Sequence, residues 1–483
     1  MEKRYWKILL IIGILFHILA ALIMPIGLDA HVHSTYVTDQ MDDGEGHLEW
    51  GELRQESEIG STPSESSSEN RWFAWHIFIE AWFTLFGASL VTLHVMSLIV
   101  SLGCLATIFL ATRGLFGVDQ ALKITALASI YPPLIRATGR FYQENAILLV
   151  VTISSYCVIK YLQSENKQPK WLAFPILSIF ILASFKGMPL WMGIVAIAGF
   201  YVSTKFDIDV YKLLFIAISV ELFVIWRNGI SILQLNIILA LLASVIAAII
   251  FLYCAVLLGK NMSFNNKNSL IIHNGTILIL AVLIGWVAGL WVSESYYQNS
   301  SIFEVFYKFR NNPRYLTLLF VPLLYSRLLE DDSYELISEK NKSYGYSFLI
   351  IMVVINAAVL SLAVGERGTQ IIGEQLNSDI ESGQDILFIS DANLAMHRMY
   401  TMHLTLDPES DNDNLAIWRT SDSGWLSELN ECEKMSNVHW IVVDYTGIET
   451  VPENWEEIEI EFDSDIHEGY RLLKWGEDFA RCP

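Results

Sequence analysis

The stretch WKILLIIGILFHILAALIMPI, residues 6–26, lies near the start of a chain of 483 residues, 53% of which are hydrophobic. It carries no charged residue after Lys7, and roughly 17–25 apolar residues are enough for a helix to cross a membrane. Similar apolar runs recur along the chain. Inside lipid each backbone polar group must be hydrogen-bonded within its own segment, which favours helices. The sequence therefore predicts a multi-pass α-helical membrane protein.

Positively charged residues predict the orientation of these spans. Before residue 365, fifteen Lys and Arg residues fall on the side of Lys3 and Arg4 and nine on the other, so we expect a cytoplasmic N-terminus and a place in the cell (plasma) membrane. A cleaved signal peptide is the alternative for the first run, which is long and lacks a clear small-residue cleavage site. Together with residues 6–26, about eleven spans are predicted, at approximately 88–112, 119–136, 143–163, 171–185, 188–204, 210–226, 232–258, 274–293, 315–329 and 345–364.

The C-terminal residues 365–483 differ from the membrane domain predicted at 1–364. They contain 26 acidic and 7 basic residues, which argues against binding nucleic acid, and an odd number of spans places them outside. Short apolar runs, DILFIS, WIVVDY and EIEIEF, with a helical pattern near 392–402, predict a small extracytoplasmic α/β domain. A disulfide between Cys432 and Cys482 is an open alternative to two free thiols.

The first external loop is predicted at 27–71, as a polar and partly disordered segment that includes the low-complexity stretch STPSESSSEN. It begins GLDAHVHSTY, so Asp29, His31 and His33 follow the first span directly. In an extended segment these three side chains would share one face and could bind a divalent metal. The alternative is that they are ordinary polar residues of the loop.

Several cations lie near helix ends on the predicted outer side. Charge at membrane depth is costly and is usually retained for function, and converging cations suit a phosphate. Snorkelling of these side chains to lipid headgroups is the alternative. The set comprises Arg136, Arg140, Lys186, Arg227, Lys308, Arg310 and Arg314.

Two further features of the sequence each have two possible interpretations. Glu144 follows Arg140 by four residues, so on one helix the two could form an ion pair, or Glu144 could orient a substrate. The aromatic stretch RWFAWHIFIEAWF, residues 71–83, indicates an interfacial helix. Trp72 and Trp75 would anchor it in the membrane or stack against a sugar.

Four segments, in order, resemble one family. They are HIFIEAWFTLFGASLVTLHVMSLIVSLGCLATIFLATRGLFG (76–117), ASIYPPLIRATGRFYQENAILLV (128–150), ILASFKGMPLWMGIVAI (181–197) and FRNNPRYLTLLFVPLL (309–324). Together they are similar to the protein O-mannosyltransferase and aminoarabinose-transferase superfamily, the GT-C type glycosyltransferases of the family-39 kind. The resemblance covers roughly residues 5–330, and Met188 interrupts the Lys-Gly-Pro pattern of the third segment.

This resemblance implies an inverting transfer of a sugar from a polyprenyl- or dolichyl-phosphate donor to a protein, lipid or glycan acceptor. Asp29 occupies the place of the family's essential acid and would act as base or orient the acceptor. Ala30 replaces the second acid of the family's pair, and His31 is the expected substitute. Glu144 takes an acidic position of the second segment. An archaeal or bacterial source fits the acidic surface and the lipid-linked chemistry.

The donor phosphate is expected to contact Arg136, Arg140, Lys186, Arg310, Arg314 and Tyr315, of which the resemblance favours Lys186 and Arg314. No nucleotide-binding Walker A pattern occurs, so an ATP-driven pump is not expected. The alternative from another class is a secondary transporter, a polysaccharide flippase or an export component.

Overall fold

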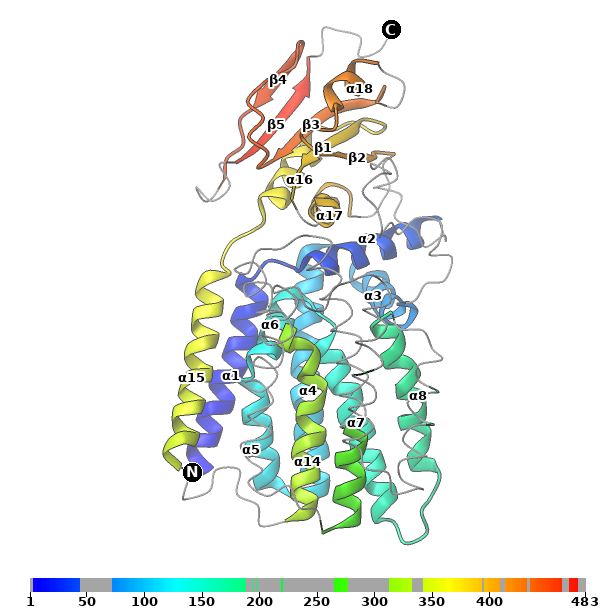
Figure 1. Cartoon of the computed structure of the whole chain (residues 1–483), viewed down its shortest axis with the longest axis vertical. Coiled ribbons are helices and arrows are strands. Elements are labelled where there is room, and N and C mark those ends of the chain that lie inside the picture. The colour runs from blue at the N-terminus through cyan, green and yellow to red at the C-terminus, as the bar shows by residue number, and fades with distance from the viewer. Residues whose placement is uncertain are drawn as a thin grey trace. The chain divides into compact units, whose positions relative to one another are not determined.

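A computed structural model describes residues 3–43, 72–187, 265–276, 312–331, 342–392, 395–408, 413–431, 435–462 and 469–476, and the single positions 194, 198 and 219. The chain divides into two compact units (Figure 1). The first, here the helical unit, comprises residues 1–20, 97–138 and 143–362. The second, here the sheet unit, comprises residues 21–96, 139–142 and 363–483.

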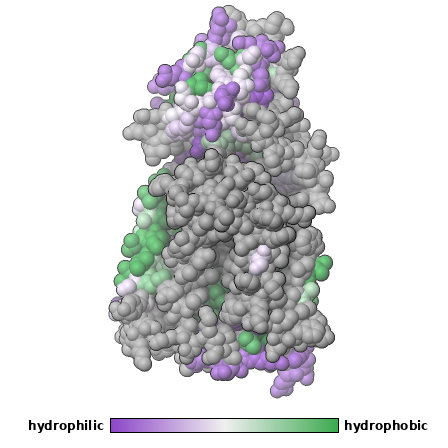
Figure 2. All heavy atoms as spheres, viewed as in Figure 1, coloured by the Kyte–Doolittle hydropathy of each residue, from purple (hydrophilic) through white to green (hydrophobic). Residues whose placement is uncertain are grey.

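Four helices of the described residues are long and apolar enough to cross a membrane. They are α1 (Lys3–Ile23), α4 (Leu90–Phe116), α7 (Glu144–Gln163) and α15 (Lys342–Leu362). Large apolar side chains on α1, α4 and α15 stay exposed, which is costly in water and favourable in lipid. Figure 2 shows such side chains in green. The helices match four of the predicted spans, and the helical fold fits a membrane protein.

The predicted span at 119–136 is wrong as a single helix. It consists of α5 (Val118–Ser129) and α6 (Pro132–Arg140), which are separated at Ile130 and Tyr131. Pro132 explains the break, because proline lacks an N–H donor and pushes the preceding residue out of the helical region. Two other predicted spans correspond to α8 (Lys170–Phe185) and to η4 (Asn312–Leu319) with α14 (Phe320–Glu330).

The total of eleven spans is untested. The predicted spans at 188–204, 210–226, 232–258 and 274–293 fall wholly or largely outside the described residues.

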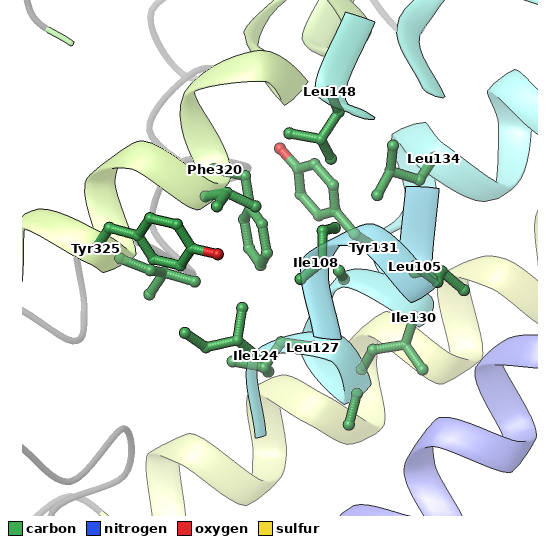
Figure 3. Packing of buried hydrophobic residues seen from close by; sticks show 14 of the residues in the cluster. Leu105, Ile108, Ile124, Leu127, Ile130, Tyr131, Leu134, Leu148, Phe320 and Tyr325 are labelled. Carbon is green, nitrogen blue, oxygen red and sulfur yellow. The ribbon is translucent and has the colours of Figure 1, made fainter. Parts of the chain in front are cut away.

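The core of the helical unit joins the break after α5 to the start of α14. The Tyr131 ring stacks on Phe320 with centroids 5.1 Å apart (Figure 3). Nearby, the Tyr325 and Thr112 hydroxyls hydrogen-bond at 2.9 Å. Fully buried aromatic rings of this size fix the elements that carry them. Because η4 leads directly into α14, this core also fixes Arg314 in η4.

A five-stranded sheet forms the centre of the sheet unit, in the order β2-β1-β3-β5-β4. β1 pairs in parallel with β2 and β3, whereas β5 pairs antiparallel with β3 and β4. The strands are β1 (Asp385–Ser390), β2 (Ala416–Arg419), β3 (Val438–Asp444), β4 (Trp455–Ile458) and β5 (Tyr470–Trp475).

Helices cover both faces of this sheet. Ile386 and Phe388 of β1 pack with α16 (Gly368–Asp379) and α17 (Ala395–Leu406). Leu387 and Ile389 point to the other face and pack with α18 (Trp425–Glu431). Burial on both sides explains why DILFIS is an unbroken apolar run.

The predicted C-terminal strands and helix are confirmed as a small sheet with helices on both faces. β1, β3 and α17 match the predicted elements. The third predicted strand, EIEIEF, corresponds to β4, which begins two residues earlier, at Trp455. The sequence analysis did not predict β2, β5, α16 or α18. Cys432 and Cys482 lie outside the described residues, so the disulfide stays a prediction.

The predicted loop at 27–71 is wrong over its first part, because Leu28–Asp43 forms the helix α2. α2 buries small polar side chains, and Val32 and Tyr36 pack against the core of the sheet unit. The aromatic stretch forms α3 (Phe73–Phe86). The sheet unit is thus wider than residues 365–483.

Candidate functional site

The link between α1 and α2 is fastened to the end of α6. The Gly27 N–H donates to the Arg140 carbonyl at 2.9 Å, and Arg140 Nη1 donates to the Pro25 carbonyl at 2.9 Å. A Cβ atom at Gly27 would lie 2.5 Å from the Tyr142 ring and 2.9 Å from the Arg140 carbonyl oxygen. Only glycine permits this approach, which sets where α2 begins.

Asp29 lies half-buried in the first turn of α2, where the helix dipole favours a negative charge. Its carboxylate acts electrostatically on Arg367 and His397. Arg367 precedes α16, and its Nε donates to the Ile26 carbonyl at 3.1 Å. Burial lowers the pKa of His397, and the Asp29 charge opposes that shift. Segments far apart in sequence therefore converge around one carboxylate.

His31 is fully buried, and its Nε2 hydrogen-bonds to the Gln370 amide nitrogen at 3.0 Å. Burial, with the neighbouring Arg367 charge, holds the pKa of His31 well below its ordinary value. The bond of His31 joins α2 to α16. Its predicted catalytic role stays a prediction.

The extended segment assumed for a metal site is wrong, because Asp29, His31 and His33 lie on a helix. Residues two apart on a helix point about 200° apart, so the three do not share a face. His33 Nδ1 instead hydrogen-bonds His76 Nε2 at 2.9 Å. Within the described ranges, no group of three or more His, Cys, Asp or Glu side chains could hold a metal ion.

Glu144, the first residue of α7, lies in an ion triad of the helical unit. Its Oε1 is 2.7 Å from Lys186 Nζ and 3.7 Å from Arg314 Nε. The exposed fractions of the three side chains are 3%, 17% and 12%. Lys186 follows α8 and Arg314 lies in η4, so one buried carboxylate joins three elements. Two cationic side chains thus share one carboxylate oxygen.

The predicted Arg140–Glu144 pair on one helix is wrong in its geometry. Arg140 ends α6 and Glu144 begins α7, and Phe141 between them has a φ of +53°. A positive φ at a bulky residue interrupts the helix. Arg136 lies one turn before Arg140 on α6 and is half-buried.

The remaining predicted residues divide as follows. The side chain of Tyr315, and all of Arg227, Lys308 and Arg310, lie outside the described residues. Trp75 is 1% exposed, so the prediction that it stacks against a sugar is wrong, because a ligand cannot reach its ring. Trp72 is 37% exposed, which leaves its ring accessible.

Sequence reasoning missed Arg367, His397 and Tyr142, which surround Asp29 or its link. For Arg367 one signal existed, because it lies three residues after the last predicted span, on the predicted side of Asp29. His397 and Tyr142 carry no pattern that marks them.

These groups allow two kinds of chemistry. A carboxylate beside guanidinium and imidazole groups can bind or deprotonate a hydroxyl. Cationic side chains held together by one carboxylate can bind an anion. No protein-family model matches the sequence, and no curated protein is significantly similar to it.

Proposed function

We propose that the chain is a GT-C type membrane glycosyltransferase, with about eleven spans, a cytoplasmic N-terminus and residues 365–483 outside. It would move a sugar from a polyprenyl- or dolichyl-phosphate donor to an extracytoplasmic acceptor, with inversion. One observation carries the proposal: Asp29 is half-buried shortly after a candidate membrane helix, where its charge acts on Arg367 and His397. A carboxylate in this position is what acceptor activation requires.

In the proposed reaction, the acceptor hydroxyl oxygen attacks the anomeric carbon of the donor sugar. The bond from that carbon to the phosphate oxygen breaks, and its electron pair stays on the phosphate. The hydroxyl proton passes to the Asp29 carboxylate or to solvent near it. The transition state resembles an oxocarbenium ion, as in glycoside hydrolysis.

The leaving phosphate gains negative charge, and cations held in place stabilise it without reorganising. Lys186 and Arg314 are the proposed contacts, because Glu144 holds both cations together, at 2.7 Å and 3.7 Å from one carboxylate oxygen. Arg136 and Arg140 of α6 are further candidates. Contacts by Arg310 and Tyr315 stay predictions.

A secondary transporter is the second candidate, favoured by one feature. α5 and α6 have 12 and 9 residues and meet at a break, and α6 in turn is interrupted before the charged start of α7. Interrupted helices with charged ends are typical of transporter substrate sites.

The test uses purified protein in detergent with radiolabelled polyprenyl-phosphate sugars and scores release of free lipid phosphate. Asp29→Asn removes the carboxylate, and Lys186→Ala removes one cation. Asp42→Asn is the matched control, because Asp42 is an exposed acid on the same helix. We expect turnover in wild type and in Asp42→Asn, with a loss of about 100-fold or more in Asp29→Asn.

Other outcomes separate the alternatives. Turnover that survives in Asp29→Asn would keep the transferase but assign the acid's role to another residue. No turnover with any donor, in protein shown to be folded, would reject the proposal. Uptake of a sugar into proteoliposomes by such protein would favour the transporter.

A further inference from the structure

A pocket of about 630 Å³ lies within the sheet unit, at the carboxyl ends of its two central parallel strands. Asp391 directly follows β1. Asp444 is the last residue of β3, and Tyr445 is the residue after it. From β1 the chain continues through α17 to β2, whereas from β3 it continues to β4 on the opposite side (Figure 1). In open α/β sheets, ligands bind in the crevice where neighbouring connections diverge in this way.

The charged lining is mixed: Glu366, Asp391 and Asp444 face Arg398 and Arg367, the same arginine whose Nε bonds the Ile26 carbonyl. Asp391 and Asp444 are already neutralised or hydrogen-bonded. The Asp444 side chain is fully buried and accepts bonds from Ser390 Oγ at 2.6 Å and from Arg398 Nη1 at 2.8 Å. The Asp391 carboxylate accepts bonds from the N–H and the hydroxyl of Ser421, at 2.8 and 2.7 Å. A phosphate site would present surplus positive charge, so this mixed lining favours a neutral polar ligand.

Arg398 can donate further hydrogen bonds into the pocket. Its bonds to Asp444 all come from Nη1, and 36% of its side chain is exposed. The other nitrogens of the fork match two neighbouring hydroxyl oxygens, because guanidinium donors lie in one plane at fixed spacing. Anchored by a buried carboxylate, this donor needs little ordering when a ligand binds.

Tyr445 presents an aromatic ring beside these donors. Its backbone has a φ of +52°, unusual for a bulky residue, and the residue is 49% exposed. The ring lies edge-on to Tyr470 at 4.8 Å, and a Cβ atom at Gly469 would overlap it. A strained backbone holding an exposed ring is typical of a ligand contact. The ring offers an apolar face next to hydrogen-bond donors.

We propose that this pocket binds a neutral sugar residue of a glycan. A sugar ring has an apolar C–H face, which suits Tyr445, and adjacent hydroxyls, which suit Arg398. The volume falls in the range of roughly 300–1,000 Å³ that is usual for small-molecule sites. This binding does not depend on the proposed transferase activity, because it is measured without a donor.

The experiment is saturation-transfer NMR on the full chain in lipid nanodiscs, which avoid sugar-based detergents. The probes are glucose, mannose, galactose and N-acetylglucosamine, with inorganic phosphate as the anionic probe. Tyr445→Asn removes the ring, and asparagine tolerates the left-handed backbone. Leu426→Asn is the control, because Leu426 is 40% exposed on α18, which packs on the other face of the sheet.

We expect at least one sugar to bind wild type and Leu426→Asn equally, and Tyr445→Asn roughly tenfold more weakly. Arg398→Lys should weaken binding similarly while keeping a charge on Asp444. No sugar binding to folded wild type would overturn the proposal. Equal binding by all variants would also overturn it, and so would binding of phosphate but no sugar.

Discussion

The distances within the ion triad of Glu144, Lys186 and Arg314 predict how much stability each substitution in it costs. At an effective dielectric constant of about 20, charges at 2.7 Å and 3.7 Å attract by about 6 and about 4.5 kcal/mol, before desolvation is subtracted. Desolvation offsets most of this attraction, but removing one partner leaves a buried charge uncompensated. We therefore expect Glu144→Gln to lower the free energy of unfolding by about 3 kcal/mol.

The same distances rank the two cations. Lys186→Gln should cost more stability than Arg314→Gln, since its nitrogen is closer to the shared carboxylate oxygen. In a double-mutant cycle, Glu144 and Lys186 should couple by roughly 1–3 kcal/mol. The assay is reversible unfolding in mixed micelles with increasing denaturing detergent, read by tryptophan fluorescence.

Lys160→Gln is the matched control. Lys160 lies on the same helix, α7, and its Nζ makes an exposed bond of 3.2 Å to the Gly114 carbonyl. Its substitution should change stability by less than about 0.5 kcal/mol. A coupling energy near zero would refute the reasoning, because the carboxylate would then not hold α8 to α7. A larger cost for Arg314→Gln than for Lys186→Gln would refute the distance ranking.

Three further predictions concern the sheet unit. Gly27→Ala should destabilise the protein by about 1–3 kcal/mol, seen as a lower midpoint in thermal unfolding, because the new Cβ meets the Tyr142 ring and the chain must shift. Burial lowers the pKa of His403 to about 3, below its unfolded value of 6.5. The unfolded state therefore binds a proton first as the pH falls. The free energy of unfolding is highest above pH 6.5 and decreases toward pH 3 by up to about 1.4 kcal/mol per pH unit. His403→Gln should flatten that pH dependence in denaturant titrations. Ser390→Ala should cost about 1–3 kcal/mol by removing the hydroxyl that donates to buried Asp444, and Ser390→Thr should recover part of it if the donor is what matters.

The sequence predicts a span correctly where the local composition alone is enough to make the segment a helix. α1, α4 and α7 are continuous apolar runs, and a segment in lipid has no alternative to the helix. β1 and β3 could be predicted for a related reason, because each has buried faces and a continuous apolar run, at 386–389 and 440–443.

α2 could not be predicted, since its buried face is polar. Ser34 and Thr38 are buried there, and their hydroxyls donate to the Ala30 and Thr35 carbonyls at 2.8 and 2.9 Å. Such bonds allow hydroxyl side chains to pack inside a helix without unpaired groups. Composition alone presents the same residues as a solvated loop.

The residues around Asp29 could not be predicted from the sequence either. Arg367 and His397 lie more than 300 residues away along the chain, and Arg140 reaches the preceding link through two backbone contacts. No spacing rule encodes this convergence, which depends on α2 packing against the core around α17. The acid itself could be singled out because its place after a span is local.

These surroundings bear on how Asp29 would act in the proposed transfer. The helix N-terminus favours the ionised carboxylate of Asp29, which can accept a hydrogen bond from a hydroxyl but is a far weaker base than an alkoxide. An early proton transfer from a neutral hydroxyl to such an acid is unfavourable. The acceptor proton is therefore expected to leave late, after the bond to the phosphate has lengthened and the attacking oxygen has become acidic. Of the two roles predicted for Asp29, orienting the acceptor hydroxyl toward the anomeric carbon is the one that this charge arrangement favours.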